Sequence, residues 1–202
     1  RTHRLDMQRG GLVVRSSSRP TSSNSEPTAS AICVDERGDN FVVVASGANA
    51  ALSTALVASG LANLTQGDVC VVNFEVPPAA ADEAARTAAE CGARLLVNPS
   101  PVRELTTEIL RASPVLVANA DEIRALTDEA DLAAGALALL ESCCETVVVT
   151  LGAAGAHVTT RDGTHAQIPA HPANPADTTG AGDTFAGVLA GGLEAGKAGR
   201  AA

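Results

Sequence analysis

The residues with the clearest chemical use form one run near the end of the chain, residues 177–187, with the sequence DTTGAGDTFAG. Gly180 and Gly182 let the main chain turn tightly and bring successive N–H groups close to a ligand. Those N–H groups continue into the amino end of a helix, whose dipole favours an anion. The run therefore predicts a hole that fits a phosphoryl group.

Asp183 lies inside this predicted hole, directly after Ala181 and Gly182. A bound phosphate repels a neighbouring carboxylate, so the use we expect for Asp183 is to take a proton from an attacking hydroxyl. This combination suits phosphoryl transfer. The simpler interpretation is an ordinary glycine-rich turn before a buried helix, because GxG tripeptides are common and turn chemistry explains them.

A helix is expected to follow the run. Apolar residues recur at i, i+3, i+4 and i+8 as Phe185, Val188, Leu189 and Leu193, which predicts one apolar stripe. Gly196 is a suitable end for this helix.

An alternation of apolar runs and alanine-rich stretches indicates the framework that positions these residues. Strands are expected near 69–73, 94–97, 115–118 and 146–150, and helices near 50–63, 78–91 and 129–142. Such alternation predicts βαβ crossovers and a mainly parallel sheet covered by helices. Two hairpins are also expected, one from 29–35 and 41–45 and the other from 156–160 and 165–168.

Four polar or glycine-containing segments follow the predicted parallel strands. Their leading residues are Glu75, Asn98, Asn119 and Gly152. Ligands of open α/β sheets bind outside the carboxyl ends of the strands, so these segments should converge on one rim. Each also has a structural explanation, with Asn119 as a helix cap, the glycines as turn formers and Glu75 as a surface residue. Glu122 has one too, as a solvated acid in a first helical turn, and Gly155 as a second turn former.

Composition disfavours several classes of partner. The chain has 202 residues, 46% of them apolar, enough for one α/β domain with a substantial core. A net charge of −9, a single lysine at 197 and only three aromatic residues disfavour nucleic acid. No apolar run approaches the roughly 18 residues that span a bilayer, so we expect no membrane segment.

Five cysteines lie mostly in apolar runs and show no CxxC spacing, so we interpret them as buried thiols. They are Cys33, Cys70, Cys91, Cys143 and Cys144. This odd count fits a reducing compartment, and we expect a cytoplasmic protein. The four histidines are scattered, which disfavours a histidine metal site.

Residues 1–27 differ from the rest because they are rich in arginine and serine and poor in acids. We expect a low-complexity, disordered leader or a spurious end. The alternative is a transit peptide, which would place the protein in an organelle.

Six segments, in the same order along the chain, resemble the ribokinase family of carbohydrate kinases, the PfkB family. They are SGANAAL at 46–52, FEVP at 74–77, NPSP at 98–101, NADE at 119–122, TLGAAG at 150–155 and DTTGAGDTFAG at 177–187. Within the family they favour the ribokinase branch over fructokinases, adenosine kinases and ketodeoxygluconate kinases. The resemblance implies a ribokinase-like three-layer α/β sandwich with a mainly parallel central sheet, partial here, over residues 28–202. Strands near 29–45 would be the remnant of a β lid.

The resemblance also implies roles around the phosphoryl group. Asp183 corresponds to the catalytic base that activates the primary hydroxyl of the sugar, and it also contacts that substrate. Gly180, Ala181 and Gly182 correspond to the anion hole. Glu75 corresponds to a glutamate that contacts the sugar.

Further roles concern the nucleotide and the metal ions. Asn119 and Glu122 match the NxxE motif of the magnesium and phosphate network, for which oxygen ligands are chemically suitable. Thr150, Gly152 and Gly155 match the segment that contacts the nucleotide. Asp177 and Thr179 match part of a monovalent-cation site, occupied by potassium. The implied cofactors are therefore Mg²⁺ and K⁺, with ATP as co-substrate.

The activity implied is phosphoryl transfer from ATP to a pentose, ribose to ribose 5-phosphate, by a protein that forms a homodimer through the lid. However, no segment matches the family's first signature, a Gly-Gly-Lys-Gly-Ala-Asn-like run that binds the sugar, so the chain resembles the middle of such a kinase. The alternatives are a truncated, non-catalytic module that binds nucleotide or a partner, and a related sugar or nucleoside kinase. A dinucleotide-binding oxidoreductase is disfavoured because no GxGxxG follows the first strand.

Overall fold

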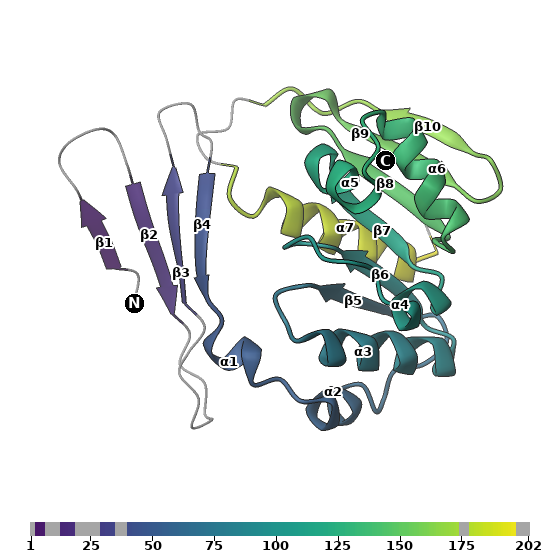
Figure 1. Ribbon diagram of the computed structural model, residues 1–202, viewed down its shortest axis with the longest axis horizontal. Helices are drawn as coiled ribbons and strands as arrows, with labels where there is room; N and C mark the ends of the chain where they lie inside the picture. Colours follow the sequence, from purple (N-terminus) through teal and green to yellow (C-terminus); the bar gives the residue numbers. More distant parts are fainter. Residues whose placement is uncertain (1–2, 7–12, 19–28, 35–39, 174–177, 197–202) are drawn as a thin grey trace. The chain divides into compact units, whose positions relative to one another are not determined.

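Two separate β-sheets organise the chain, which is described here by a computed structural model covering residues 3–6, 13–18, 29–34, 40–173 and 178–196 (Figure 1). They belong to two units. The first comprises Arg1–Leu52 and Asn174–Thr184, and the second comprises Ser53–Ala173 and Phe185–Ala202.

The first unit contains a four-stranded antiparallel sheet in the order β1-β2-β3-β4. Its strands are β1 (His3–Asp6), β2 (Val13–Ser18), β3 (Ala29–Val34) and β4 (Asn40–Ala45), and the short helix α1 (Gly47–Ala50) follows. The predicted hairpin is confirmed, since Ala29 pairs with Ala45 and Val34 with Asn40. β1 and β2 fall in the range 1–27, where we expected no secondary structure, and the β-branched Val13 and Val14 suit a strand. The division at residue 27 stays a prediction.

The second unit contains a six-stranded sheet in the order β10-β9-β8-β7-β6-β5. Four strands run parallel, as predicted: β5 (Val69–Asn73), β6 (Arg94–Asn98), β7 (Val115–Asn119) and β8 (Thr146–Thr150). The second predicted hairpin, β9 (Ala156–Thr160) and β10 (His165–Ile168), extends the sheet antiparallel beyond β8. In the part of the chain that the structure describes, β5 has a neighbouring strand on one side only.

Helices connect these strands. They are α2 (Thr54–Gly60), α3 (Pro78–Cys91), α4 (Thr107–Arg111), α5 (Ala120–Thr127), α6 (Leu132–Glu141) and α7 (Ala181–Glu194), with a 3₁₀ turn at Gly152–Ala154. Neither α4 nor α5 was predicted from the sequence. Both begin at a side-chain cap, because Thr106 accepts from the Ile109 N–H and Asn119 from the Glu122 N–H.

Helices cover both faces of the six-stranded sheet, which confirms the layered fold. Alternate residues of each strand point to opposite faces, so Leu95 and Val97 pack in the core under α3, α5 and α6, while Leu96 belongs to a second core. α3 presents a buried face made only of alanines, which lets it approach the sheet closely. The second core is closed by α7, through Ala186 and Leu193.

The predicted apolar stripe of α7 is wrong in two of its four positions. Val188 is 72% exposed and Phe185 is 36% exposed. Ala186 and Ala190 take part in the packing beside Leu189 and Leu193, at i, i+3, i+4 and i+7. Small side chains bring the helix axis close to the sheet, and the prediction counted only large apolar residues.

The expectation that the cysteines are buried holds for some of them only. Cys70 and Cys144 are buried, Cys91 is half-buried and Cys143 is exposed, and all four are free thiols. The side chain of Cys33 lies outside the described residues. Among those residues, no helix is both long enough and apolar enough to cross a membrane.

Candidate functional site

The carboxyl ends of the four parallel strands form a stepped rim. Asn73 pairs with Asn98 at the ends of β5 and β6, and Asn119 pairs with Thr150 at the ends of β7 and β8. Between the two pairs the register shifts, because Leu96 pairs with Val115 and Val97 with Leu116. β7 and β8 therefore extend two residues, or about 7 Å, beyond β6.

The side chain of Asn98 covers this step. Its Nδ2 donates a hydrogen bond to the carbonyl oxygen of Val117 at 2.9 Å. The side chain of Asn98 thus makes a hydrogen bond to β7 at the point where β6 ends, and its amide N–H group is used within the sheet. The structure therefore gives Asn98 a structural role.

Asn119 and Glu122 stand at the outer level of the rim, where β7 passes directly into α5. Asn119 Oδ1 accepts hydrogen bonds from the N–H groups of Asp121 and Glu122 at 3.0 and 2.9 Å. Glu122 Oε2 accepts one from the Asn119 N–H at 2.8 Å. This reciprocal pair is a capping box. The carboxylate is thereby fixed at the start of a helix, where the dipole favours negative charge.

Thr150 and the turn after it form the next part of the outer level. Thr150 Oγ1 lies 3.5 Å from the Ala118 carbonyl oxygen. Gly152 has φ +57° and is exposed, with open space where a Cβ would be. Gly155 has φ +93°, and a Cβ there would meet the Ile168 carbonyl oxygen at 1.9 Å. Gly155 therefore has a structural role as a turn former, while Gly152 leaves the rim open.

Glu75 lies at the inner level, just after β5, with its side chain exposed. Its N–H donates to Asn73 Oδ1 at 3.3 Å. The preceding residue, Phe74, is only 3% exposed, and its N–H donates to the Ser100 carbonyl oxygen at 3.0 Å. The carboxylate thus projects from a short segment that is anchored in the core on one side.

The DTTGAGD loop leads into α7. Gly180 has φ +77°, and its carbonyl oxygen accepts from both the N–H and the Oγ1 of Thr184, at 2.9 and 2.8 Å. Ala181 N–H donates to the Thr178 carbonyl oxygen at 3.1 Å. Asp183 is exposed in the first turn of the helix. The first N–H groups of an α-helix have no partner within it, so this turn has the donors that an anion hole needs.

The predicted site residues fall in both units. Six of them lie at or beyond the carboxyl ends of parallel strands in the second unit: Glu75, Asn119, Glu122, Thr150, Gly152 and Gly155. Thr179, Gly180, Ala181, Gly182 and Asp183 belong to the first unit. Asp177 lies outside the described residues, and Thr179 is exposed. Among the described side chains, no group of three or more His, Cys, Asp or Glu residues could hold a metal ion.

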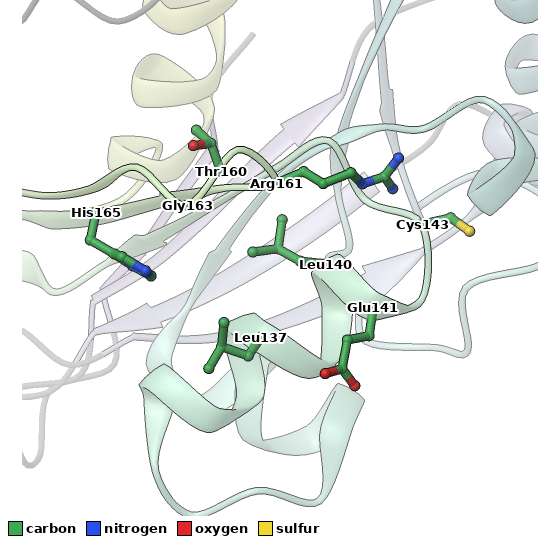
Figure 2. Close-up of a pocket in the computed structure, with 8 residues that line it drawn as sticks. All are labelled: Leu137, Leu140, Glu141, Cys143, Thr160, Arg161, Gly163 and His165. Carbon is green, nitrogen blue, oxygen red and sulfur yellow. The ribbon is translucent and has the colours of Figure 1, made fainter.

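A pocket of about 470 Å³ lies at the opposite edge of the six-stranded sheet. Thr160 lines it, and Thr160 pairs with Thr146 at the amino end of β8. Figure 2 shows side chains of α6, including Leu137 and Leu140, on one side and residues of the β9–β10 hairpin, including His165 at the start of β10, on the other. No predicted site residue lines this pocket, so we do not assign it to the candidate site.

Arg103 was not predicted from the sequence as part of the site. It lies in the segment between β6 and α4, and its guanidinium lies 4.1 Å from the centre of the Phe74 ring, next to Glu75. An arginine in a polar segment gives no local signal of such a contact.

Comparison with known proteins gives one consistent family. The profile of the pfkB family carbohydrate kinases matches residues 13–202. The chain is 35% identical over 179 residues to a bifunctional ribokinase/ribose-5-phosphate isomerase A of Fructilactobacillus sanfranciscensis, a match covering 86% of this chain and 33% of that protein. It is 32% identical over 166 residues to the ribokinase of Mus musculus, covering 79% of this chain and 51% of that one.

A solved ribokinase from Thermotoga maritima has a similar fold. It aligns with a TM-score of 0.75 at 26% identity, over 86% of this chain and 58% of that one. The chain therefore spans about half the length of the mouse ribokinase and somewhat more of the Thermotoga protein.

Proposed function

The chain belongs to the pfkB family of carbohydrate kinases, and we propose that the whole protein transfers the γ-phosphoryl group of ATP to the primary hydroxyl of a pentose, converting ribose to ribose 5-phosphate. The observation that carries this proposal is the DTTGAGD loop, which turns at Gly180 and places Asp183 in the first turn of α7. Similarity to proteins named ribokinase supports ribose as the sugar.

In this proposal Asp183 is the general base. The sugar hydroxyl oxygen attacks the γ-phosphorus, the bond from that phosphorus to the bridging oxygen breaks, and ADP leaves. The hydroxyl proton passes to the Asp183 carboxylate and then to solvent. The loop of Gly180, Ala181 and Gly182 stabilises the charge on the transferred group, because the helix amino end favours an anion. The N–H groups of Gly180 and Gly182 are the donors in this proposal, since the Ala181 N–H donates to the Thr178 carbonyl oxygen.

The rim of the parallel sheet supplies the remaining contacts. Glu75 accepts hydrogen bonds from sugar hydroxyls, and Thr150 and Gly152 contact the nucleotide phosphates. Open space at Gly152 supports this, since a phosphate needs close approach to the backbone. Thr150 ends β8, and Gly152 begins the turn that follows.

Of the two residues assigned to the magnesium network, Glu122 offers an oxygen that fits Mg²⁺, whereas the one side-chain oxygen of Asn119 already accepts two backbone hydrogen bonds. Glu122 uses Oε2 in the capping box, while Oε1 takes part in no hydrogen bond or ion pair among the described residues. That oxygen suits a metal-bound water, because Mg²⁺ keeps several waters and binds protein through one or two carboxylates. When bound with ATP, the ion neutralises charge on the phosphates. We assign K⁺ to oxygen donors of Asp177 and Thr179 by family resemblance alone.

The test is sugar-dependent consumption of ATP by the complete natural protein, with the product identified by mass and by its phosphate position. We expect ribose 5-phosphate and ADP in equal amounts. Turnover of another pentose or of a nucleoside would place the protein with a related kinase. Nucleotide binding without turnover of any sugar would favour the non-catalytic alternative. Light scattering on the same sample tests the expected dimer, which the lid strands would form.

A further inference from the structure

We propose that Arg103 is a positioning residue that holds the segment carrying Glu75 in place for the sugar. This inference rests on the proposed function only for the role of Glu75. The contacts by which Arg103 holds the segment are seen in the structure and do not depend on that proposal.

The contacts of Arg103 lie on both sides of Glu75. Its Nη1 donates a hydrogen bond to the Val76 carbonyl oxygen at 2.9 Å. Its guanidinium lies 4.1 Å from the centre of the Phe74 ring, within the range of a cation–π contact. The residues before and after Glu75 are therefore both held by one side chain, which comes from a different connection, 27 residues along the chain from Val76.

A second contact joins the same two segments. The Phe74 N–H donates to the Ser100 carbonyl oxygen at 3.0 Å, three residues before Arg103. The Phe74 side chain is buried in the core with Leu95 and Val97. The segment after β5 and the β6–α4 connection are thus joined by one backbone hydrogen bond and by the two contacts of Arg103. We call the two Arg103 contacts the clamp.

The way Arg103 is buried argues against a purely stabilising role. Its Nε and Nη2 are buried, and neither has a hydrogen-bond partner in the part of the chain that the structure describes. Burial lowers the pKa of this guanidinium, although Asp82 opposes the shift. Donors left unpaired in the interior cost stability, and an apolar side chain could pack over Phe74 without that cost.

Among the described arginines, Arg94 and Arg161 also donate to distant carbonyl oxygens, those of Leu193 at 3.5 Å and Cys144 at 2.9 Å. Three others behave differently. Arg86, Arg111 and Arg124 pair with carboxylates of their own helices, on exposed surfaces. Such pairs contribute little and constrain no distant segment. The contacts of Arg103 therefore fit a role in positioning the segment around Glu75 better than a role in charge pairing.

The proposed benefit is pre-organisation. Glu75 projects from a short connection after β5, and fixing that connection before the sugar arrives removes part of the ordering cost of binding. A loose segment would weaken sugar binding while leaving the nucleotide contacts at β7 and β8 unaffected.

The experiment uses Arg103→Met and Arg103→Lys in the complete protein. Met keeps a long apolar chain over Phe74 but removes every donor, and Lys restores one donor without the planar group. Arg111→Met is the matched control, because Arg111 is exposed and bonded to Glu108 in α4. We expect Arg103→Met to raise the KM and Kd for ribose about tenfold, the loss expected for one charged hydrogen bond. The KM for ATP should change less than twofold, Lys should recover part of the loss, and the control should match the wild type.

Two further measurements separate positioning from a general structural effect. In a Glu75→Ala background, Arg103→Met should add little further loss of sugar affinity, because contacting residues that act together are not additive. Amide hydrogen exchange at residues 74–76 should speed up in Arg103→Met and not in Arg111→Met. Unchanged sugar affinity, or an equal loss with and without Glu75, overturns the inference.

Hydrogen exchange also distinguishes this inference from the proposed function. If the wild type phosphorylates no sugar, the proposed function fails, and faster exchange at residues 74–76 in Arg103→Met still supports the clamp. If exchange at residues 74–76 is unchanged in Arg103→Met, Arg103 does not hold the segment. Should the Arg103→Met variant fail to fold, unchanged exchange in Arg103→Lys gives the same conclusion.

Discussion

Asn119 and Glu122 bond to each other in both directions: the Asn119 N–H donates to Glu122 Oε2 at 2.8 Å, and the Glu122 N–H donates to Asn119 Oδ1 at 2.9 Å. The two residues that we assign to the magnesium and phosphate network therefore also start a helix. One oxygen of each side chain is committed to the backbone. A simple deletion of either side chain would confuse lost folding with lost function.

Glu122→Gln separates these roles. The glutamine side-chain oxygen can still accept from the Asn119 N–H, so the free energy of unfolding should stay within about 0.5 kcal/mol of the wild type, whereas Glu122→Ala should lose about 1 kcal/mol. Loss of the charge should lower magnesium-dependent turnover by about 10- to 100-fold in both variants. Urea titrations and ATP kinetics at varied Mg²⁺ measure the two effects. Asp121→Asn, an exposed residue of the same helical turn, is the control.

Asp183→Asn tests the proposed base. Asparagine keeps the shape of the side chain, while general-base assistance is typically worth about 10² to 10⁴ in rate. We expect kcat to fall at least about a hundredfold, with Mg²⁺–ATP affinity preserved or slightly improved, as steady-state kinetics and calorimetry would show. Glu194→Gln, at the other end of α7, should be close to the wild type. Activity above about a tenth of the wild type in Asp183→Asn would rule out this assignment.

Gly155 and Gly152 should respond very differently to alanine. At Gly155 the φ is +93°, and the Ile168 carbonyl oxygen lies 1.9 Å from the point that a Cβ would occupy, which leaves no room for a side chain. Gly155→Ala should lose more than about 3 kcal/mol of stability, because backbone strain and a clash with main chain add together. Gly152→Ala, with open space around it, should lose about 1 kcal/mol from its φ of +57° alone. Thermal and urea unfolding compare the two, and equal losses would contradict the described turn.

The neighbouring Cys143 and Cys144 give a prediction on pH. Burial raises the pKa of Cys144 from its ordinary value of 9.0 to about 12. The folded state thus holds this proton more tightly than the unfolded chain, so the stabilisation is complete below pH 9 and is lost as the pH rises towards 12. The free energy of unfolding should decline above about pH 9, and less steeply in Cys144→Ala. Cys143→Ala removes an exposed thiol and should leave the wild-type slope; identical slopes for both variants would contradict the prediction.

The four parallel strands of the second unit were predictable because each is a short run rich in valine and leucine, and burial on both faces produces such runs. α5 was not predicted as a helix, since it follows β7 without a connection. The cap at Asn119 was recognised only as one of two interpretations. Short-range pattern thus gave the strands and the fold class.

Packing and distant contacts were less accessible from the sequence. The apolar stripe of α7 was misplaced because Ala186 and Ala190, rather than Phe185 and Val188, pack against the sheet. Which face of α7 lies nearest the sheet depends on tertiary packing. The clamp by Arg103 joins segments 27 residues apart. No local spacing encodes that contact.

One strand has a consequence for the behaviour of this chain in solution. β5 pairs with β6 on one side and, among the described residues, with nothing on the other, and its Val71 is 49% exposed. Unused donors and acceptors along a strand serve as a template on which a second molecule can be added. The isolated chain should therefore aggregate. Because aggregation requires collisions between molecules, its rate should rise more steeply than in proportion to the protein concentration. Val71→Lys should slow it at little cost in stability, because like charges on approaching molecules repel, and turbidity measured at several concentrations would show whether it does.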